Sequence, residues 1–115
     1  MADARFRMPT QAGPNRTDKN RRQAVDLELN DEQRAFAQAA RDYAQGVLAP
    51  HAAQWDAEGI FPREAFASAG ELGFCAIYAN ESIGGLGLPR LDATLVFEEM
   101  AAVDPSTTAF LTIHN

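Results

Sequence analysis

The sequence has little of what several classes of protein require. Its 115 residues contain one cysteine, Cys75, which can form neither an internal disulfide nor a multi-cysteine zinc site. No apolar run approaches the roughly 18–20 residues of a membrane-spanning helix, and no apolar segment resembles a secretory signal. Acidic residues outnumber basic ones by 16 to 10, which argues against nucleic acid and membrane surfaces as partners because both attract clustered positive charge. The composition therefore predicts one acidic domain in a reducing compartment.

The charge is unevenly distributed. Residues 1–25 carry six basic and two acidic residues, a balance of +4, whereas residues 26–115 carry four basic and 14 acidic residues, a balance of −10. A segment with few large apolar side chains cannot bury enough surface to offset its ordering entropy. We therefore expect residues 1–26 to form a disordered basic tail and residues 27–115 to form the folded domain. A mitochondrial targeting peptide is an alternative interpretation of this arginine-rich segment, although it has no serine and no helical apolar stripe.

Local signals predict an all-α fold of about four helices, without a strand. The expected helices span roughly residues 31–48, 62–72, 90–103 and 105–115. Asn30 and Gln33 have the spacing of a capping box at the start of the first helix. Gly73 suits the position just after the second helix, and Asp104 followed by Pro105 is typical of an N-cap and the first helical residue.

Two of these helices show apolar faces. In the first, the face consists of Phe36, Ala40, Tyr43 and Val47, which recur at helical spacing. In the third, a wider face consists of Leu91, Leu95, Val96, Met100 and Val103. We expect the third helix to be central to the packing.

The remaining segments are predicted to be irregular. Residues 51–60 and 74–79 show no sustained pattern, and Gly84, Gly85 and Gly87 forbid a regular helix in the loop that follows. This glycine loop precedes a helix, as phosphate-binding loops do. However, it lacks the Lys-Ser/Thr pair of a P-loop and a strand leading into it, so a tight structural turn is favoured over phosphate binding.

No set of residues predicts a complete active site. Cys75 lies in an apolar run, where a cysteine is usually a small buried hydrophobe. His51 and His114 are too far apart to have metal-ligand spacing. Glu98 and Glu99 are adjacent helical residues that point about 100° apart, which favours a solvated flank with one ion pair. We therefore assign no catalytic residue and no metal site.

The order of the local features resembles the N-terminal helical domain of acyl-CoA dehydrogenases, from Leu29 to Asn115. No single feature is specific, but seven occur in the family's order and spacing. They are Glu32-Gln33, Ala49-Pro50, Trp55-Asp56, Phe61-Pro62, Glu71-Leu72-Gly73-Phe74, Gly84-Gly85-Leu86-Gly87 and Phe97-Glu98-Glu99. Within the family, residues 106–110 and 113–115 are most similar to the branch that acts on isobutyryl-CoA.

This resemblance implies a flavin-dependent oxidation in which most of the reacting groups belong to other domains of the enzyme. Such enzymes remove a proton from the α carbon of an acyl-CoA with a glutamate and pass a hydride from the β carbon to FAD. Electron-transferring flavoprotein then reoxidises the flavin, and the enzyme is a homotetramer. The family places most flavin contacts in a following β domain and the catalytic glutamate, in most members, in a C-terminal bundle. Neither Glu98 nor Glu99 matches that glutamate, and we expect this chain alone not to retain FAD.

The resemblance assigns one functional region to this domain. Thr108, Ala109 and Thr112 share a helical face and match positions that line the acyl pocket in related enzymes. Small side chains there would leave room for a branched short acyl group. Packing of the three residues against a neighbouring helix is the alternative.

Three functional hypotheses follow. In the first, the chain is the N-terminal part of an acyl-CoA dehydrogenase, as the resemblance implies, and the last helix has no stop signal before Asn115, which suggests a longer polypeptide. The location expected from the resemblance is the bacterial cytoplasm, or the mitochondrial matrix in a eukaryote. In the second, the chain is a truncated, catalytically inactive helical module with a structural or interaction role. In the third, it is a decayed fragment that aggregates through its uncovered apolar faces.

Overall fold

A computed structural model describes residues 28–115, and the predicted tail over residues 1–26 lies outside them. The described elements are α1 (Asp31–Tyr43), the π-helical turn η2 (Ala44–Leu48), α2 (Ala52–Glu58), α3 (Arg63–Glu71), the 3-10 turn η3 (Glu81–Ile83), α4 (Arg90–Ala101) and α5 (Pro105–His114). Residues 28–115 contain no strand, which confirms the all-α prediction. Five α-helices occur in this part of the chain, one more than the four that the sequence located, and the additional one is α2.

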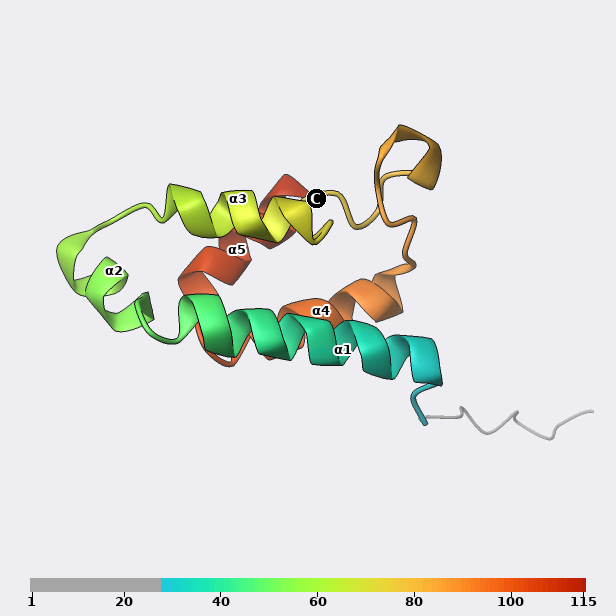
Figure 1. Ribbon diagram of the computed structural model, residues 1–115, viewed down its shortest axis with the longest axis horizontal. Helices are drawn as coiled ribbons and strands as arrows, with labels where there is room; N and C mark the ends of the chain where they lie inside the picture. Colours follow the sequence, from blue (N-terminus) through green and yellow to red (C-terminus); the bar gives the residue numbers. More distant parts are fainter. Residues whose placement is uncertain (1–27) are drawn as a thin grey trace, which may run out of the picture.

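The helices α1 and α4 lie on one side of the molecule, α3 lies on the other, and α5 crosses between them (Figure 1). Figure 1 shows α1 along one side with α4 behind it, α3 along the opposite side, α5 crossing between them and α2 at one end. The closest helix pair is α1 and α4. The core draws on every α-helix except α2 and consists of Ala40, Tyr43, Ala44, Leu48, Ala65, Ala69, Phe74, Ile77, Ala93, Val96, Met100 and Leu111.

The predicted capping box starts α1 and also joins it to α4. The Asn30 side chain accepts the Gln33 backbone N–H at 2.8 Å, and the Gln33 side chain accepts the Asn30 N–H at 3.1 Å. The Gln33 amide nitrogen then donates to Oδ1 of the largely buried Asp92 at 2.8 Å. One local signal in the sequence therefore also fixes a tertiary contact.

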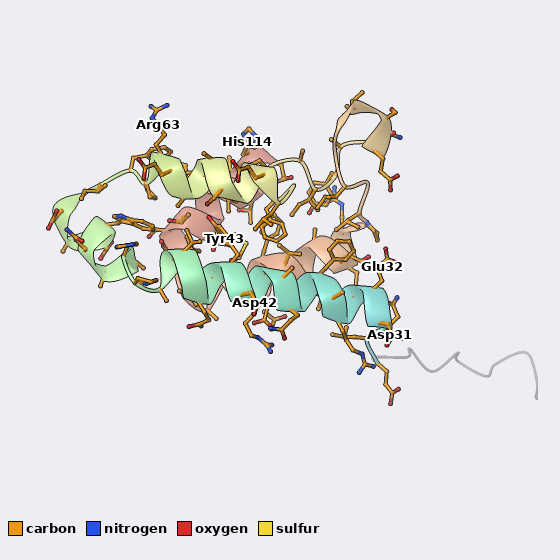
Figure 2. All side chains as sticks on the ribbon, viewed as in Figure 1. Asp31, Glu32, Asp42, Tyr43, Arg63 and His114 are labelled. Carbon is orange, nitrogen blue, oxygen red and sulfur yellow. The ribbon has the colours of Figure 1, made fainter. Side chains whose placement is uncertain are left out.

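Tyr43 joins α1 to the opposite side of the molecule. Its hydroxyl donates to the Ala65 carbonyl at 2.7 Å, and its ring meets Phe74 edge to face with centroids 5.9 Å apart. Burial raises the pKa of this hydroxyl, which therefore remains a donor. Figure 2 shows Tyr43 pointing into the interior while its neighbour Asp42 points away.

The helix α2 (Ala52–Glu58) was not predicted. It follows Pro50 and ends at Gly59, whose φ of 65° is left-handed. None of its residues is buried, although Trp55 packs partly against the core. Because none of its seven residues is buried, the helix does not need a face of apolar residues, and the sequence therefore shows no helical apolar pattern there. The preceding Pro50 and the following Gly59 are the signals that delimit it.

Gly73 ends α3 as predicted. Its φ is 84°, and the N–H groups of Gly73 and Phe74 donate to the carbonyls of Gly70 and Ala69 at 3.0 and 2.9 Å. This is the Schellman pattern, which requires a left-handed residue that only glycine adopts readily. The turn directs Phe74 into the core, where it is 2% exposed.

Gly85 is required because two backbone segments approach each other closely. A Cβ atom at Gly85 would lie 2.0 Å from the Ala79 carbonyl oxygen, whereas a Cβ at Gly46 would meet no atom within 4 Å. The segments on either side are joined by hydrogen bonds from the N–H groups of Leu86 and Leu88 to the carbonyls of Ala76 and Ile77. No side chain can be added at Gly85 without separating them.

The pair Arg41 and Glu99 joins the exposed sides of α1 and α4. Arg41 Nε and Nη2 donate to the two Glu99 carboxylate oxygens at 2.9 and 2.6 Å. The hydrogen bond and charge of Arg41 lower the pKa of Glu99, and Glu99 raises the pKa of Arg41. The ion pair that the sequence predicted beside Glu98 and Glu99 is confirmed for Glu99.

We expect Gly85→Ala to destabilise the domain and Gly46→Ala not to. The first substitution forces a Cβ into the Ala79 backbone, at a cost of about 1–3 kcal/mol. The second fills open space on a helix, where alanine is favoured over glycine by roughly 0.5–1 kcal/mol. Urea unfolding of the 115-residue chain followed by circular dichroism measures both. Equal midpoints for the two variants would contradict this account.

The contribution of the Arg41–Glu99 pair should depend on pH. A carboxylate whose pKa is lower when folded stabilises the protein above its unfolded pKa of about 4.3 and loses this effect as the pH falls through the folded value. We therefore expect Glu99→Gln to lower the unfolding midpoint slightly at pH 7, with the difference vanishing in acid. Glu98→Gln is the matched control, since no ion pair of Glu98 occurs among residues 28–115. A Glu99→Gln effect that persists in acid would refute the role of the charge.

Candidate functional site

A groove of about 590 Å³ lies between α4 and α5. The groove is wide open on one side, so it can supply one wall of a small-molecule site but cannot enclose a ligand by itself. The lining residues are Thr94, Phe97, Glu98, Ala101, Pro105, Thr108, Ala109 and Thr112. All three residues that the sequence assigns to an acyl group, Thr108, Ala109 and Thr112, are among them.

The turn at Asp104 builds this groove. Its carboxylate accepts the Thr107 N–H at 3.0 Å and the Thr107 hydroxyl at 2.5 Å, which caps α5 as predicted. Asp104 is only 6% exposed, and its own N–H donates to the Met100 carbonyl at the end of α4. The same residue therefore ends one wall and starts the other.

The three predicted residues differ in exposure. Thr108 is 3% exposed, and its hydroxyl donates to the Asp104 carbonyl at 2.7 Å. Ala109 and Thr112 are exposed, and the Thr112 hydroxyl donates to the Ala109 carbonyl at 2.8 Å. Thr108 thus packs at the base of the groove, while Ala109 and Thr112 lie on its open side.

The groove is hydrocarbon in character. Its surface is mostly carbon, from the ring of Phe97, the methyl groups of Ala101 and Ala109, and Pro105. The hydroxyl of Thr94, like those of the two lining threonines on α5, donates to a carbonyl of its own helix, that of Arg90, at 2.8 Å. Such a surface can hold an apolar group. Its one ionisable residue, Glu98, is exposed to solvent, and the lining holds neither a nucleophile paired with a base nor a set of metal ligands.

The α4 wall of the groove is the part of the site that the sequence reasoning missed. It consists of Thr94, Phe97, Glu98 and Ala101, which recur at i, i+3, i+4 and i+7 and so share a helical face. That spacing was the signal that could have identified them. Ile113 and Phe110 are exposed apolar residues of α5 outside the groove, and Phe110 meets Phe61 edge to face with centroids 5.4 Å apart.

Other reactive side chains have structural surroundings. Burial raises the pKa of the Cys75 thiol, which lies 3.7 Å from the Phe66 carbonyl and is therefore a poor nucleophile. His51 packs against the Trp55 ring with centroids 5.5 Å apart, and His114 lies exposed near the end of α5 (Figure 2). Residues 28–115 hold no group of three or more side chains suited to a metal ion. None of the described helices is long and apolar enough to cross a membrane.

The glycine loop does not offer free amides to a phosphate. The N–H groups of five consecutive residues, 84–88, donate to carbonyls of Glu81, Asn80, Ala76, Ala79 and Ile77 at 2.8–3.1 Å. Phosphate loops instead point several unpaired N–H groups at the ligand. The structural turn favoured by the sequence therefore accounts for this loop.

The comparisons with known proteins agree on one family. The profile described as acyl-CoA dehydrogenase, N-terminal domain, matches residues 30–115. The mitochondrial isobutyryl-CoA dehydrogenases of Dictyostelium discoideum and Bos taurus are 48% and 41% identical over 87 residues, which is 76% of this chain and 21% of each relative. The mitochondrial short-chain specific acyl-CoA dehydrogenase of Mus musculus is 34% identical and is covered to 22%.

A solved structure has the same arrangement of helices. It is described as the electron transferring flavoprotein of Acidaminococcus fermentans, studied towards a mechanism of flavin-based electron bifurcation. The matched chain superposes with a TM-score of 0.72 at 34% identity, over 76% of this chain and 23% of its own length. The chain thus spans about a fifth of the length of the relatives that it matches.

Proposed function

The chain belongs to the acyl-CoA dehydrogenase family, as its N-terminal domain, and we propose that it forms one wall of the acyl pocket in an enzyme that dehydrogenates a short or branched acyl-CoA. The observation that carries the proposal is the groove between α4 and α5, where Thr108, Ala109 and Thr112 converge. The similarity to isobutyryl-CoA dehydrogenases supports a branched short acyl group as the substrate. Small side chains at Ala109 and Thr112 leave room for such a branch.

In this proposal the described residues bind and orient the acyl group but do not react with it. The carbon surface of Phe97, Ala101 and Ala109 excludes water from the acyl group, which stabilises binding by roughly 25 cal/mol per Å² of apolar surface buried. The capped turn at Asp104 keeps this surface rigid. Holding a substrate in one geometry is itself a large contribution to catalysis.

The family uses FAD, which supplies the oxidation when it is bound. The glycine loop does not fit its pyrophosphate, because the N–H groups of residues 84–88 are all donated to backbone carbonyls of residues 76–81. We therefore assign no flavin contact and no catalytic base to this chain, and Glu99 is already occupied by Arg41. Both functions are proposed to lie in the larger part of the family's fold, beyond the fifth that this chain spans.

The remaining features of the proposed enzyme come from its relatives. Electron-transferring flavoprotein is the proposed acceptor, since it reoxidises the flavin in the enzymes that this chain resembles. A homotetramer is the proposed assembly. The mitochondrial relatives support the mitochondrial matrix as the location in a eukaryote. The cytoplasm is the proposed location in a bacterium, in keeping with a probable acyl-CoA dehydrogenase of Mycobacterium leprae that is 38% identical over 82 residues.

The decisive test is made on the holoenzyme that contains this domain. The proposal expects bound flavin whose absorbance bleaches on addition of isobutyryl-CoA under anaerobic conditions. The 115-residue chain purified alone should bind no flavin. A holoenzyme whose flavin is not reduced by any short or branched acyl-CoA would overturn the proposal and favour the inactive helical module.

We expect Ala109→Leu in the holoenzyme to raise the KM for isobutyryl-CoA by about ten-fold, because the larger side chain occupies the space of the branch. Straight-chain butyryl-CoA should be affected less. Ala39→Leu is the matched control, since Ala39 is exposed on α1, away from the groove. An unchanged ratio of the two KM values in Ala109→Leu would defeat the assignment of the pocket wall.

A further inference from the structure

We infer that Asn115 is a positioning residue for the proposed acyl site, because its side-chain amide fixes the end of α5 against residues 74–77. The inference rests on the proposed function, since α5 supplies one wall of the groove in which an acyl group is proposed to lie. It adds a residue that does not line the groove and that acts through the position of the residues that do. Its basis is the way in which one amide uses all of its hydrogen-bonding groups.

The amide of Asn115 makes three hydrogen bonds that fit only one orientation. Its nitrogen donates to the carbonyls of Phe74 and Leu111 at 2.9 and 2.8 Å, and its oxygen accepts the Ile77 N–H at 2.6 Å. The reverse orientation would direct the oxygen at two carbonyl oxygens and the NH2 group at an N–H. An amide supplies both the donors and the acceptor that this position requires, whereas a carboxylate only accepts. The surroundings of Asn115 therefore favour an amide over its isosteric acid.

The segment that receives these bonds is itself held in place. Phe74 and Ile77 are 2% and 0% exposed. The Phe74 ring meets the ring of Tyr43 on α1, and the Ile77 carbonyl accepts the Leu88 N–H at 2.9 Å. Asn115 therefore ties α5 to backbone that is already fixed by the core and by the loop before α4.

The length of α5 explains how this contact reaches the groove. The helix is held at its start by Asp104, and Asn115 provides the corresponding contact at its other end. At about 1.5 Å of rise per residue, Thr112 lies roughly 12 Å from Asp104, so a tilt of about 5° there would move Thr112 by about 1 Å. A misplacement of that size in a binding site can lower catalysis by up to about a hundred-fold. Loss of the Asn115 contact should therefore be felt at Ala109 and Thr112, which line the groove.

The test measures the steady-state kinetics of Asn115→Asp in the holoenzyme at about pH 8, where the new carboxylate is ionised. The variant keeps the size of the side chain but directs an oxygen at the carbonyls of Phe74 and Leu111. We expect the KM for isobutyryl-CoA to rise by about three- to ten-fold, with a smaller change in kcat and an unchanged flavin content. A residue that only stabilised the fold would lower the amount of active enzyme and leave the KM of the remaining enzyme as it is.

Two further variants isolate the role of the amide. Asn115→Ala removes the three hydrogen bonds without adding a repulsion, so its KM should rise less than that of Asn115→Asp. Asn80→Asp is the matched control, because the Asn80 side chain accepts the Ser82 N–H at 2.8 Å. A carboxylate accepts such a bond equally well, so this variant should keep the wild-type KM.

The outcomes separate the inference from the proposed function. A wild-type KM in Asn115→Asp, or an equal rise in Asn80→Asp, would overturn the inference and leave the proposed acyl site intact. If Asn115→Asp does not assemble with flavin, the KM of Asn115→Ala decides in the same way, since a wild-type value there would overturn the inference. A wild-type holoenzyme that turns over no short or branched acyl-CoA would overturn the proposed function, and the inference with it.

Discussion

The candidate site depends on the turn centred on Asp104. Three residues separate α4, which ends at Ala101, from α5, which begins at Pro105. Within this turn the Asp104 N–H donates to the Met100 carbonyl, while its carboxylate and carbonyl accept from Thr107 and Thr108. The buried carboxylate thus satisfies donors that the start of a helix would otherwise leave unpaired. Because these bonds converge on one residue, the end of α4 and the start of α5 are fixed relative to each other.

The far end of α5 is held by a second set of bonds. The Asn115 amide nitrogen donates to the carbonyls of Phe74 and Leu111 at 2.9 and 2.8 Å, and its oxygen accepts the Ile77 N–H at 2.6 Å. The segment that receives these bonds is itself joined to Leu86 and Leu88, just before α4. The start of α5 is therefore joined directly to the end of α4. The end of α5 is joined to the start of α4 through the loop in which Gly85 is required. A groove held at both ends suits the positioning role proposed for it.

The sequence predicted what is decided locally and missed what is decided by packing. The caps at Asn30 and Asp104 and the turn at Gly73 were predicted correctly, since each depends on residues a few positions apart. The apolar face predicted for the helix over residues 90–103 is confirmed at Val96 and Met100, which are fully buried, and is wrong at Leu91, which is 60% exposed. The inner face instead includes Asp92, which accepts from Gln33 on α1. Such a partner lies 59 positions away and is invisible to periodicity. The same limit applies to the groove, whose two walls come from different helices.

The composition of α5 follows from its two faces. Leu111 and the two threonines at 107 and 108 are buried against the core, yet Phe110 and Ile113 on the other face are exposed and apolar. A helix on the protein surface usually carries polar side chains on its exposed face, and two large apolar side chains there would be stabilised by burial. An apolar ligand or a further layer of protein would each supply that burial. At Ala109 and Thr112 there is room for an apolar ligand, because these two side chains are too short to fill the groove themselves. The lack of amphipathic periodicity in α5 is therefore consistent with a helix that packs on one side and binds on the other.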